Sequence, residues 1–186
     1  MTEPNRFPIL LSVAVILLAA GHLGFEHFTG GVRSHNLLND PDLPAISNWL
    51  GLITLPAIAV ILGLRVRTYP APAPAPAPAR LLGLPRPMLV ALVGALFYGA
   101  AMATSFWLGA ENITFGALVG LFVCALVFPV YRAEYILGFV VGMTATFGGV
   151  LPLIVALVVA VISFLSRLLF GKVFGLIGIR NKSDLA

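Results

Sequence analysis

The segment Tyr135–Leu165, YILGFVVGMTATFGGVLPLIVALVVAVISFL, contains no charged residue and decides how often the chain crosses a membrane. As a single helix, its roughly 31 residues would extend about 46 Å, which exceeds a hydrocarbon core of about 30 Å. The run is interrupted near its middle by Gly148–Gly149 and by Pro152. We therefore predict a tight helical hairpin, with a fifth span over about Ala133–Phe147 and a sixth over about Val150–Leu169.

Composition places the rest of the chain in the same membrane class. Of its 186 residues, 60% are hydrophobic and 10% are charged, whereas soluble domains are about 45–50% apolar and about 25% charged. The apolar runs are continuous, and a transmembrane β-barrel would instead show alternating residues. Runs of about 20 apolar residues predict four further spans, over Phe7 to about Gly24, about Ile46–Leu64, Met88–Leu108 and Ile113–Val130.

Charged residues lie between these spans in an order that tests the count. Most basic residues lie before span one, between spans two and three, between spans four and five, or at the end of span six and after it. They are Arg6, Arg65, Arg67, Arg80, Arg86, Arg132, Arg167, Lys172, Arg180 and Lys182. The alternate loops hold Glu26, Arg33, Asp40, Asp42 and Glu111. Because basic loops stay in the cytoplasm, six spans with both termini inside fit every charged loop, and five would place the basic tail outside. We predict an all-α, multi-pass transmembrane bundle of six spans, with five as the alternative, in a bacterial inner membrane.

The first span has a second interpretation. Arg6, the apolar run Phe7–Leu18 and the small residues Ala19–Gly21 also resemble a secretory signal with a cleavage site. Cleavage after Gly21 would leave His22 as the mature N-terminus, whose amine and imidazole could both bind a metal ion.

A proline–alanine run divides the chain into a front part, a linker and a back part. We assign them to residues 1–67 (two spans), 68–87 (cytoplasmic) and 88–186 (four spans). Alternating prolines in Pro70–Ala79 favour an extended polyproline strut. Small residues spaced four apart predict close helix packing in the back part: Ala95 and Gly99, Gly116 and Gly120, Gly138 and Gly142. After the sixth span, a basic tail with apolar residues at helical spacing predicts a helix lying on the inner leaflet.

The external loop between spans one and two collects ionisable residues in a window over residues 21–49. All three histidines lie there with three carboxylates: His22, His27, His35, Glu26, Asp40 and Asp42. Ionisable groups at a membrane boundary are costly, so they often mark a site or a pathway. Histidine with carboxylate is also a usual ligand set for Zn²⁺ or another divalent metal.

Spacing within this window is informative only in part. If the first span continues one turn past Gly24, His22 and Glu26 share a helical face at i and i+4, and His27 points elsewhere. The turn Thr29–Gly31 could fold His35 and Asp40 back onto them. The alternative is an interfacial loop whose polar groups cap helices, with Ser47 or Asn48 capping span two.

Two further polar groups are candidates. At the inner face, Arg132 and Glu134 form a candidate gate or ion pair, in which Glu134 could pair with a cytoplasmic arginine; lipid anchoring and a helix-dipole contact are the simpler interpretation. Hydroxyl side chains lie inside spans at Tyr98, Thr104, Ser105, Thr144 and Thr146. We expect the serines and threonines to bond to backbone carbonyls and to join helices.

The sequence supports two functional hypotheses. There is no phosphate-binding loop or nucleophile elbow, and the single cysteine, Cys124, excludes a cysteine metal cage. The first hypothesis is a non-enzymatic membrane protein, as a small transporter, channel or accessory subunit. The second is a membrane enzyme with a metal or acid–base centre at the outer face, acting on a lipid or amphipathic substrate. Scattered basic residues argue for the lipid bilayer and against nucleic acid as partner, and six short spans enclose little space alone, which favours a homo-oligomer.

Overall fold

The computed structural model describes residues 6–36, 41–69, 80–81 and 84–176, and these residues are mostly helical. The helices are α1 (Phe7–Phe28), η2 (a 3-10 turn, Asn48–Leu50), α2 (Gly51–Thr68), α3 (Arg86–Trp107), α4 (Glu111–Val127), α5 (Ala133–Phe147) and α6 (Val150–Leu176). The strands are β1 (Ser34–Asn36), β2 (Ala45–Ser47), β3 (Arg80–Leu81) and β4 (Leu84–Pro85). β1 pairs antiparallel with β2, and β3 pairs antiparallel with β4.

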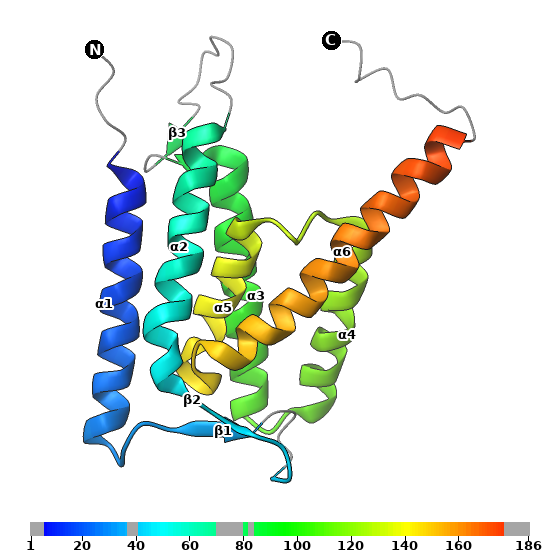
Figure 1. Cartoon of the computed structure of the whole chain (residues 1–186). Coiled ribbons are helices and arrows are strands. Elements are labelled where there is room, and N and C mark those ends of the chain that lie inside the picture. Colours follow the sequence, from blue (N-terminus) through cyan, green and yellow to red (C-terminus); the bar gives the residue numbers. More distant parts are fainter. Residues whose placement is uncertain (1–5, 37–40, 70–79, 82–83, 177–186) are drawn as a thin grey trace.

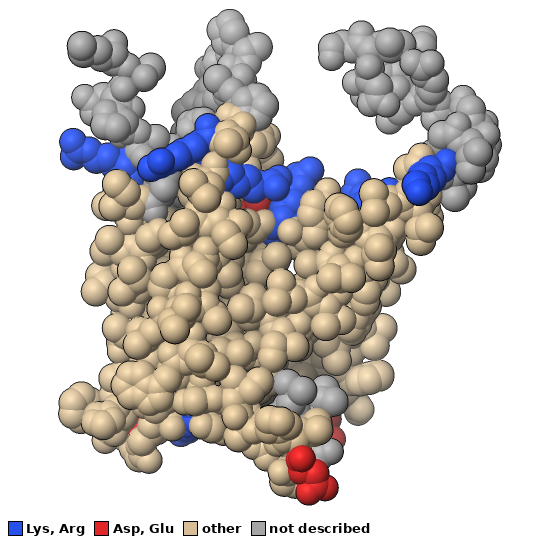
Figure 2. All heavy atoms as spheres, viewed as in Figure 1, with Lys and Arg blue, Asp and Glu red and all other residues tan. Residues whose placement is uncertain are grey.

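Successive α-helices run in alternating directions, so that α1 begins at the end of the molecule where α2 and α6 finish (Figure 1). Figure 2 shows Lys and Arg side chains gathered at this end, whereas the exposed acidic side chains lie at the other. This segregation is the arrangement on which the prediction of cytoplasmic termini was based. We call the Lys- and Arg-rich end the basic end and the opposite end the loop end, because β1 and β2 lie there.

Four of the helices are long and apolar enough to cross a membrane: Ile9–Phe28, Asn48–Thr68, Arg86–Trp107 and Val150–Lys172. The helices α4 and α5 are shorter, with 17 and 15 residues, or about 25 and 22 Å. The 27-residue α6 extends about 40 Å and lies oblique to the other helices (Figure 1), as expected for a helix longer than the hydrocarbon core.

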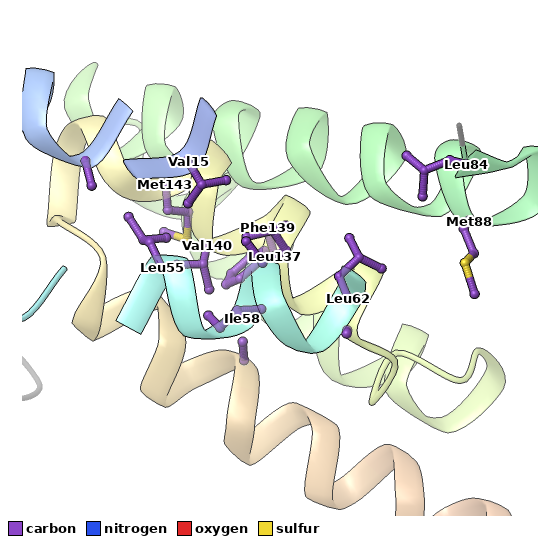
Figure 3. Close-up of a cluster of buried hydrophobic side chains, with 14 of the residues drawn as sticks. Val15, Leu55, Ile58, Leu62, Leu84, Met88, Leu137, Phe139, Val140 and Met143 are labelled. Carbon is purple, nitrogen blue, oxygen red and sulfur yellow. The ribbon is translucent and has the colours of Figure 1, made fainter. Parts of the chain in front are cut away.

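The short helix α5 occupies the centre of the bundle. It packs most extensively against α3 and also contacts α2 and α6. An added Cβ at Gly138 or Gly142 would lie well under 3.0 Å from backbone atoms of α3, so both glycines allow the two backbones to touch. Apolar side chains from α1, α2 and α5 fill the space beside this contact (Figure 3), including Leu55, Leu62 and Val140, each no more than 1% exposed.

The helices α4 and α6 form a pair held by polar contacts. The Ser163 hydroxyl donates to the Phe128 carbonyl over 2.8 Å and accepts from the Val130 amide over 3.2 Å. One turn later, the Arg167 guanidinium donates to the Val127 carbonyl over 2.8 Å. The bonds to Phe128 and Val127 satisfy carbonyl groups that the end of α4 leaves free.

The fold differs from the sequence prediction at several places. The chain is not purely α-helical, because two short antiparallel strand pairs close the loop between α1 and α2 and the entrance to α3. The first helix continues to Phe28 rather than to about Gly24. The last helix continues to Leu176 rather than ending near Leu169, because no proline or polar cap interrupts its apolar face. The proline–alanine run lies outside the described residues.

Candidate functional site

The Glu26 carboxylate is buried at the loop end and lies in contact with polar groups from several segments. The residue is 5% exposed, and its Oε1 accepts a hydrogen bond of 2.8 Å from Nδ2 of Asn48. The Arg33 backbone amide donates to Oε2 over 3.2 Å, and His22 Nε2 lies 3.4 Å from Oε1. We define the outer polar cluster as His22, Glu26, His35 and Asn48.

The final turn of α1 brings the first two cluster residues together. His22 and Glu26 are one turn apart on the same face, as the sequence predicted for a helix continuing past Gly24. The helix ends at Thr29, whose amide and hydroxyl both bond back to Phe25 O. Gly30 and Gly31 then adopt φ values of 134° and 99°, which side chains disfavour, and these glycines reverse the chain direction.

The strand pair β1–β2 carries the third cluster residue. His35 pairs with Ile46 in the register of the two strands, and its ring lies 6.5 Å from that of Phe147 at the end of α5. Its Nε2 is buried and has no hydrogen-bond partner among the described residues. Burial lowers the pKa of His35 below its usual 6.5; the positive charge of Arg33 and nearby His22 lower it further, whereas Glu26 opposes the shift.

The fourth cluster residue connects the loop to the turn between α5 and α6. Asn48 is 3% exposed, and its backbone amide donates to the Arg33 carbonyl over 3.0 Å. Its side-chain amide packs against Gly148, which adopts a φ of 67°, and any Cβ at Gly148 would overlap it. The cluster therefore joins α1, β1, the turn η2 before α2 and the α5–α6 turn in one contact region.

The third histidine of the window, His27, lies apart from this cluster. His27 is exposed and its ring contacts that of Phe28 edge-on, 5.4 Å away. Asp42 is exposed near the start of β2, and Asp40 lies outside the described residues. No group of three His, Cys, Asp or Glu side chains in the described part of the chain could hold a metal ion.

At the basic end, an ion pair joins α2 to α5. Glu134 is 2% exposed, and its Oε2 lies 3.2 Å from Nε of Arg65, whose side chain is 34% exposed. The partner of Glu134 is thus an arginine of α2 at the basic end, and the neighbouring Arg132 is half-buried at the N-terminus of α5. The pair lies where α5 begins, a position at which the helix dipole favours a carboxylate.

The hydroxyl groups within the helices serve packing. Thr104 and Thr144 donate to carbonyls one turn back on their own helices, at 2.8 and 2.7 Å. Ser105 lies 2.9 Å from the Thr114 hydroxyl, and the Tyr98 hydroxyl donates to the Ala117 carbonyl, so both contacts tie α3 to α4. The expectation of backbone bonding is confirmed for Thr104 and Thr144, and the expectation of helix joining is confirmed for Ser105.

Compared with known proteins, the chain matches no family model, no curated protein and no solved structure. Its class therefore follows from the fold alone. Four long apolar helices in an alternating bundle are those of an integral membrane protein, in a multi-pass arrangement.

Sequence reasoning missed two of the residues that complete these contacts. Asn48 was considered only as a helix cap, but Ser47 takes that role by accepting from the Trp49 amide over 3.4 Å. Asn48 instead binds Glu26, 22 positions earlier. Arg65 was counted only as a basic residue of the inner loop. In the sequence, only the position of Asn48 directly after the alternative cap Ser47 distinguishes it.

Proposed function

We propose that this protein is a non-enzymatic membrane protein, a small transporter or accessory subunit, in which the outer polar cluster is a proton-responsive latch. The observation that carries this proposal is the buried Glu26 carboxylate, which faces two imidazole-bearing segments and the α5–α6 turn. A latch is a contact whose strength changes with protonation and which holds two elements together.

The position of the cluster supports a latch. It links the first hairpin, α1–α2, to the α5–α6 hairpin, and these segments are far apart in the sequence. The His35 ring is partly buried and its Nε2 has no hydrogen-bond partner among the described residues. A proton added to His35 would therefore place a cation where it is partly removed from water. Buried charges are costly unless paired. Protonation from outside would therefore loosen the contacts of β1 with Phe147 of α5.

The composition of the cluster favours this role over the enzymatic alternative. A metal centre of the kind considered for the histidine window would need at least three converging ligands, and the described residues supply no such group. Glu26 is already engaged by Asn48 and the Arg33 amide, which suits a structural contact whose strength depends on pH. We therefore assign His22, His35 and Glu26 to the latch, and not the exposed His27.

The latch predicts a stability that falls on acidification. Because the pKa of His35 is lowered in the folded protein, its contribution to stability is fully present above pH 6.5. It is lost as the pH falls below 6.5 toward the lowered value, since the unfolded chain then binds the proton more readily. We expect the thermal unfolding temperature of the purified protein to fall between pH 7.5 and pH 5.5, and His35→Phe to reduce this fall.

The matched control for this prediction is His27→Phe. His27 is exposed at the end of α1, next to Glu26 in the chain, and its ring contacts Phe28 rather than the cluster. Its replacement should therefore leave the pH dependence unchanged. Equal pH dependence in the wild-type protein and His35→Phe would contradict the latch. The transport form of the proposal is tested separately in proteoliposomes, and an absence of flux for ions and small solutes at both pH values would leave only the accessory-subunit form.

A further inference from the structure

An apolar pocket with a volume of about 530 Å³ lies between α3, α4, α5 and α6. This volume is within the range of about 300–1,000 Å³ typical of small-molecule sites. The pocket is lined by the first half of α3, the second half of α4 and the beginning of α5, so it lies toward the basic end, away from the outer polar cluster. Figure 2 shows Lys and Arg side chains gathered at this end of the molecule.

The walls of the pocket suit a hydrocarbon chain. They consist of apolar side chains such as Val90, Leu121 and Phe139, and of the Cα of Gly94. An added Cβ at Gly94 would meet nothing within 4 Å, so the pocket is open at this point. The Tyr98 hydroxyl is already bonded to the Ala117 carbonyl and needs no polar partner from a ligand.

The rim of the pocket suits an anion. Arg86 is the only charged residue among the lining side chains, and it is exposed at the first position of the 22-residue α3. A helix N-terminus and a guanidinium both favour an anionic group. Arg167 of α6 donates to the carbonyl of Val127, which directly precedes the pocket-lining Phe128 in the chain.

We propose that this pocket binds one acyl chain of an anionic phospholipid from the cytoplasmic leaflet, with the phosphate at Arg86. The occupant is a membrane lipid because the pocket lies between helices that contact the bilayer, and it is an anionic lipid because the rim is basic. The site shares no residue with the outer polar cluster, so the proposal stands independently of the latch.

The test is a titration of the full-length protein in mild detergent with phosphatidylglycerol and with phosphatidylcholine of equal chain length, followed by native mass spectrometry. We expect one phosphatidylglycerol to bind about fivefold more tightly than phosphatidylcholine, the contribution of about one arginine near an anionic headgroup. Arg86→Gln should remove this preference and retain binding of either chain. Glycerol phosphate, which has the anion without a chain, should not bind.

A variant that fills the pocket distinguishes lipid binding in the pocket from lipid binding around the outside of the protein. Gly94→Phe places a ring in the open space and should lower phosphatidylglycerol affinity at least about tenfold. Gly116→Phe is the matched control, because Gly116 is also exposed with open space around its Cα but lies outside the pocket lining. Equal lipid binding by the two variants would overturn the proposal, as would equal affinity of the wild-type protein for the two lipids.

The single cysteine supplies a measurement that needs no substitution. Cys124 is half-buried and lines the pocket, so a bound acyl chain should shield its thiol. We expect phosphatidylglycerol to slow the modification of Cys124 by a small maleimide in the wild-type protein, and phosphatidylcholine at the same concentration to slow it less. Modification at the same rate in both lipids would contradict the site even if Gly94→Phe failed to fold.

Discussion

Replacement of Gly142 by alanine is expected to destabilise the protein by about 3 kcal/mol or more. Adding methylene groups to a packed core costs about 1–3 kcal/mol when side chains can move aside. At Gly142 the obstacle is the backbone of α3, because a Cβ would meet the Leu96 carbonyl well inside 3.0 Å and the Ala100 amide at 2.8 Å. The two helices would have to separate, and this separation would loosen the most extensive helix contact in the bundle.

The matched control is Gly116→Ala on α4. A Cβ at Gly116 would meet nothing within 4 Å, so alanine should stabilise the helix by up to about 1 kcal/mol through helix propensity. Unfolding of both variants in mixed detergent micelles, followed by circular dichroism, compares the two positions directly. A Gly142→Ala protein as stable as Gly116→Ala would show that α3 and α5 do not meet as described.

The two glycine pairs also show what the sequence could and could not predict. Gly116–Gly120 and Gly138–Gly142 have the same spacing, so the sequence predicted close packing at both. Only the pair on α5 lies against another backbone; Gly120 approaches the Tyr98 hydroxyl at 3.0 Å, and Gly116 faces open space. Spacing fixes which residues share a face, but the orientation of that face depends on packing between distant segments.

Local features were predicted more successfully. The helical hairpin breaks where Gly148–Gly149 was expected to break it, and α5 has the predicted bounds, because a glycine with positive φ ends the helix. His22 and Glu26 share a helical face at the predicted spacing. These features depend on residues within one or two helical turns of each other, so the 3.6-residue periodicity is sufficient to predict them.

Contacts between distant segments were not predictable from spacing. Asn48 donates to Glu26 across 22 positions, and Ser163 bonds to Phe128 across 35. Each depends on how complete helices pack, which a single sequence does not specify. The sequence did predict that Glu134 could pair with a cytoplasmic arginine, but several arginines lie at that end, and only the packing of α2 against α5 selects Arg65.

Removal of the Arg65 side chain is the second change with a large expected effect. Arg65→Ala would leave the Glu134 carboxylate buried at 2% exposure without its cation. Breaking a buried ion pair on one side costs about 3–5 kcal/mol. Because the Arg65 side chain keeps 34% of its exposure to solvent, we expect a loss near the lower end, about 3 kcal/mol. Detergent-induced unfolding, monitored by circular dichroism, would measure it.

A second substitution, which removes the unpaired charge of Glu134, tests whether that charge causes the destabilisation in Arg65→Ala. Glu134→Gln keeps the shape of the side chain and removes its charge, so the double variant Arg65→Ala/Glu134→Gln should be more stable than Arg65→Ala alone. If the two substitutions acted independently, their losses in the free energy of unfolding would add, and the double variant would be the least stable. A double variant more stable than Arg65→Ala therefore means that the loss in Arg65→Ala comes from the unpaired buried carboxylate. Arg67→Ala, at an exposed position of the same turn, should change stability by less than about 0.5 kcal/mol. A double variant less stable than either single one would mean that Arg65 and Glu134 act independently.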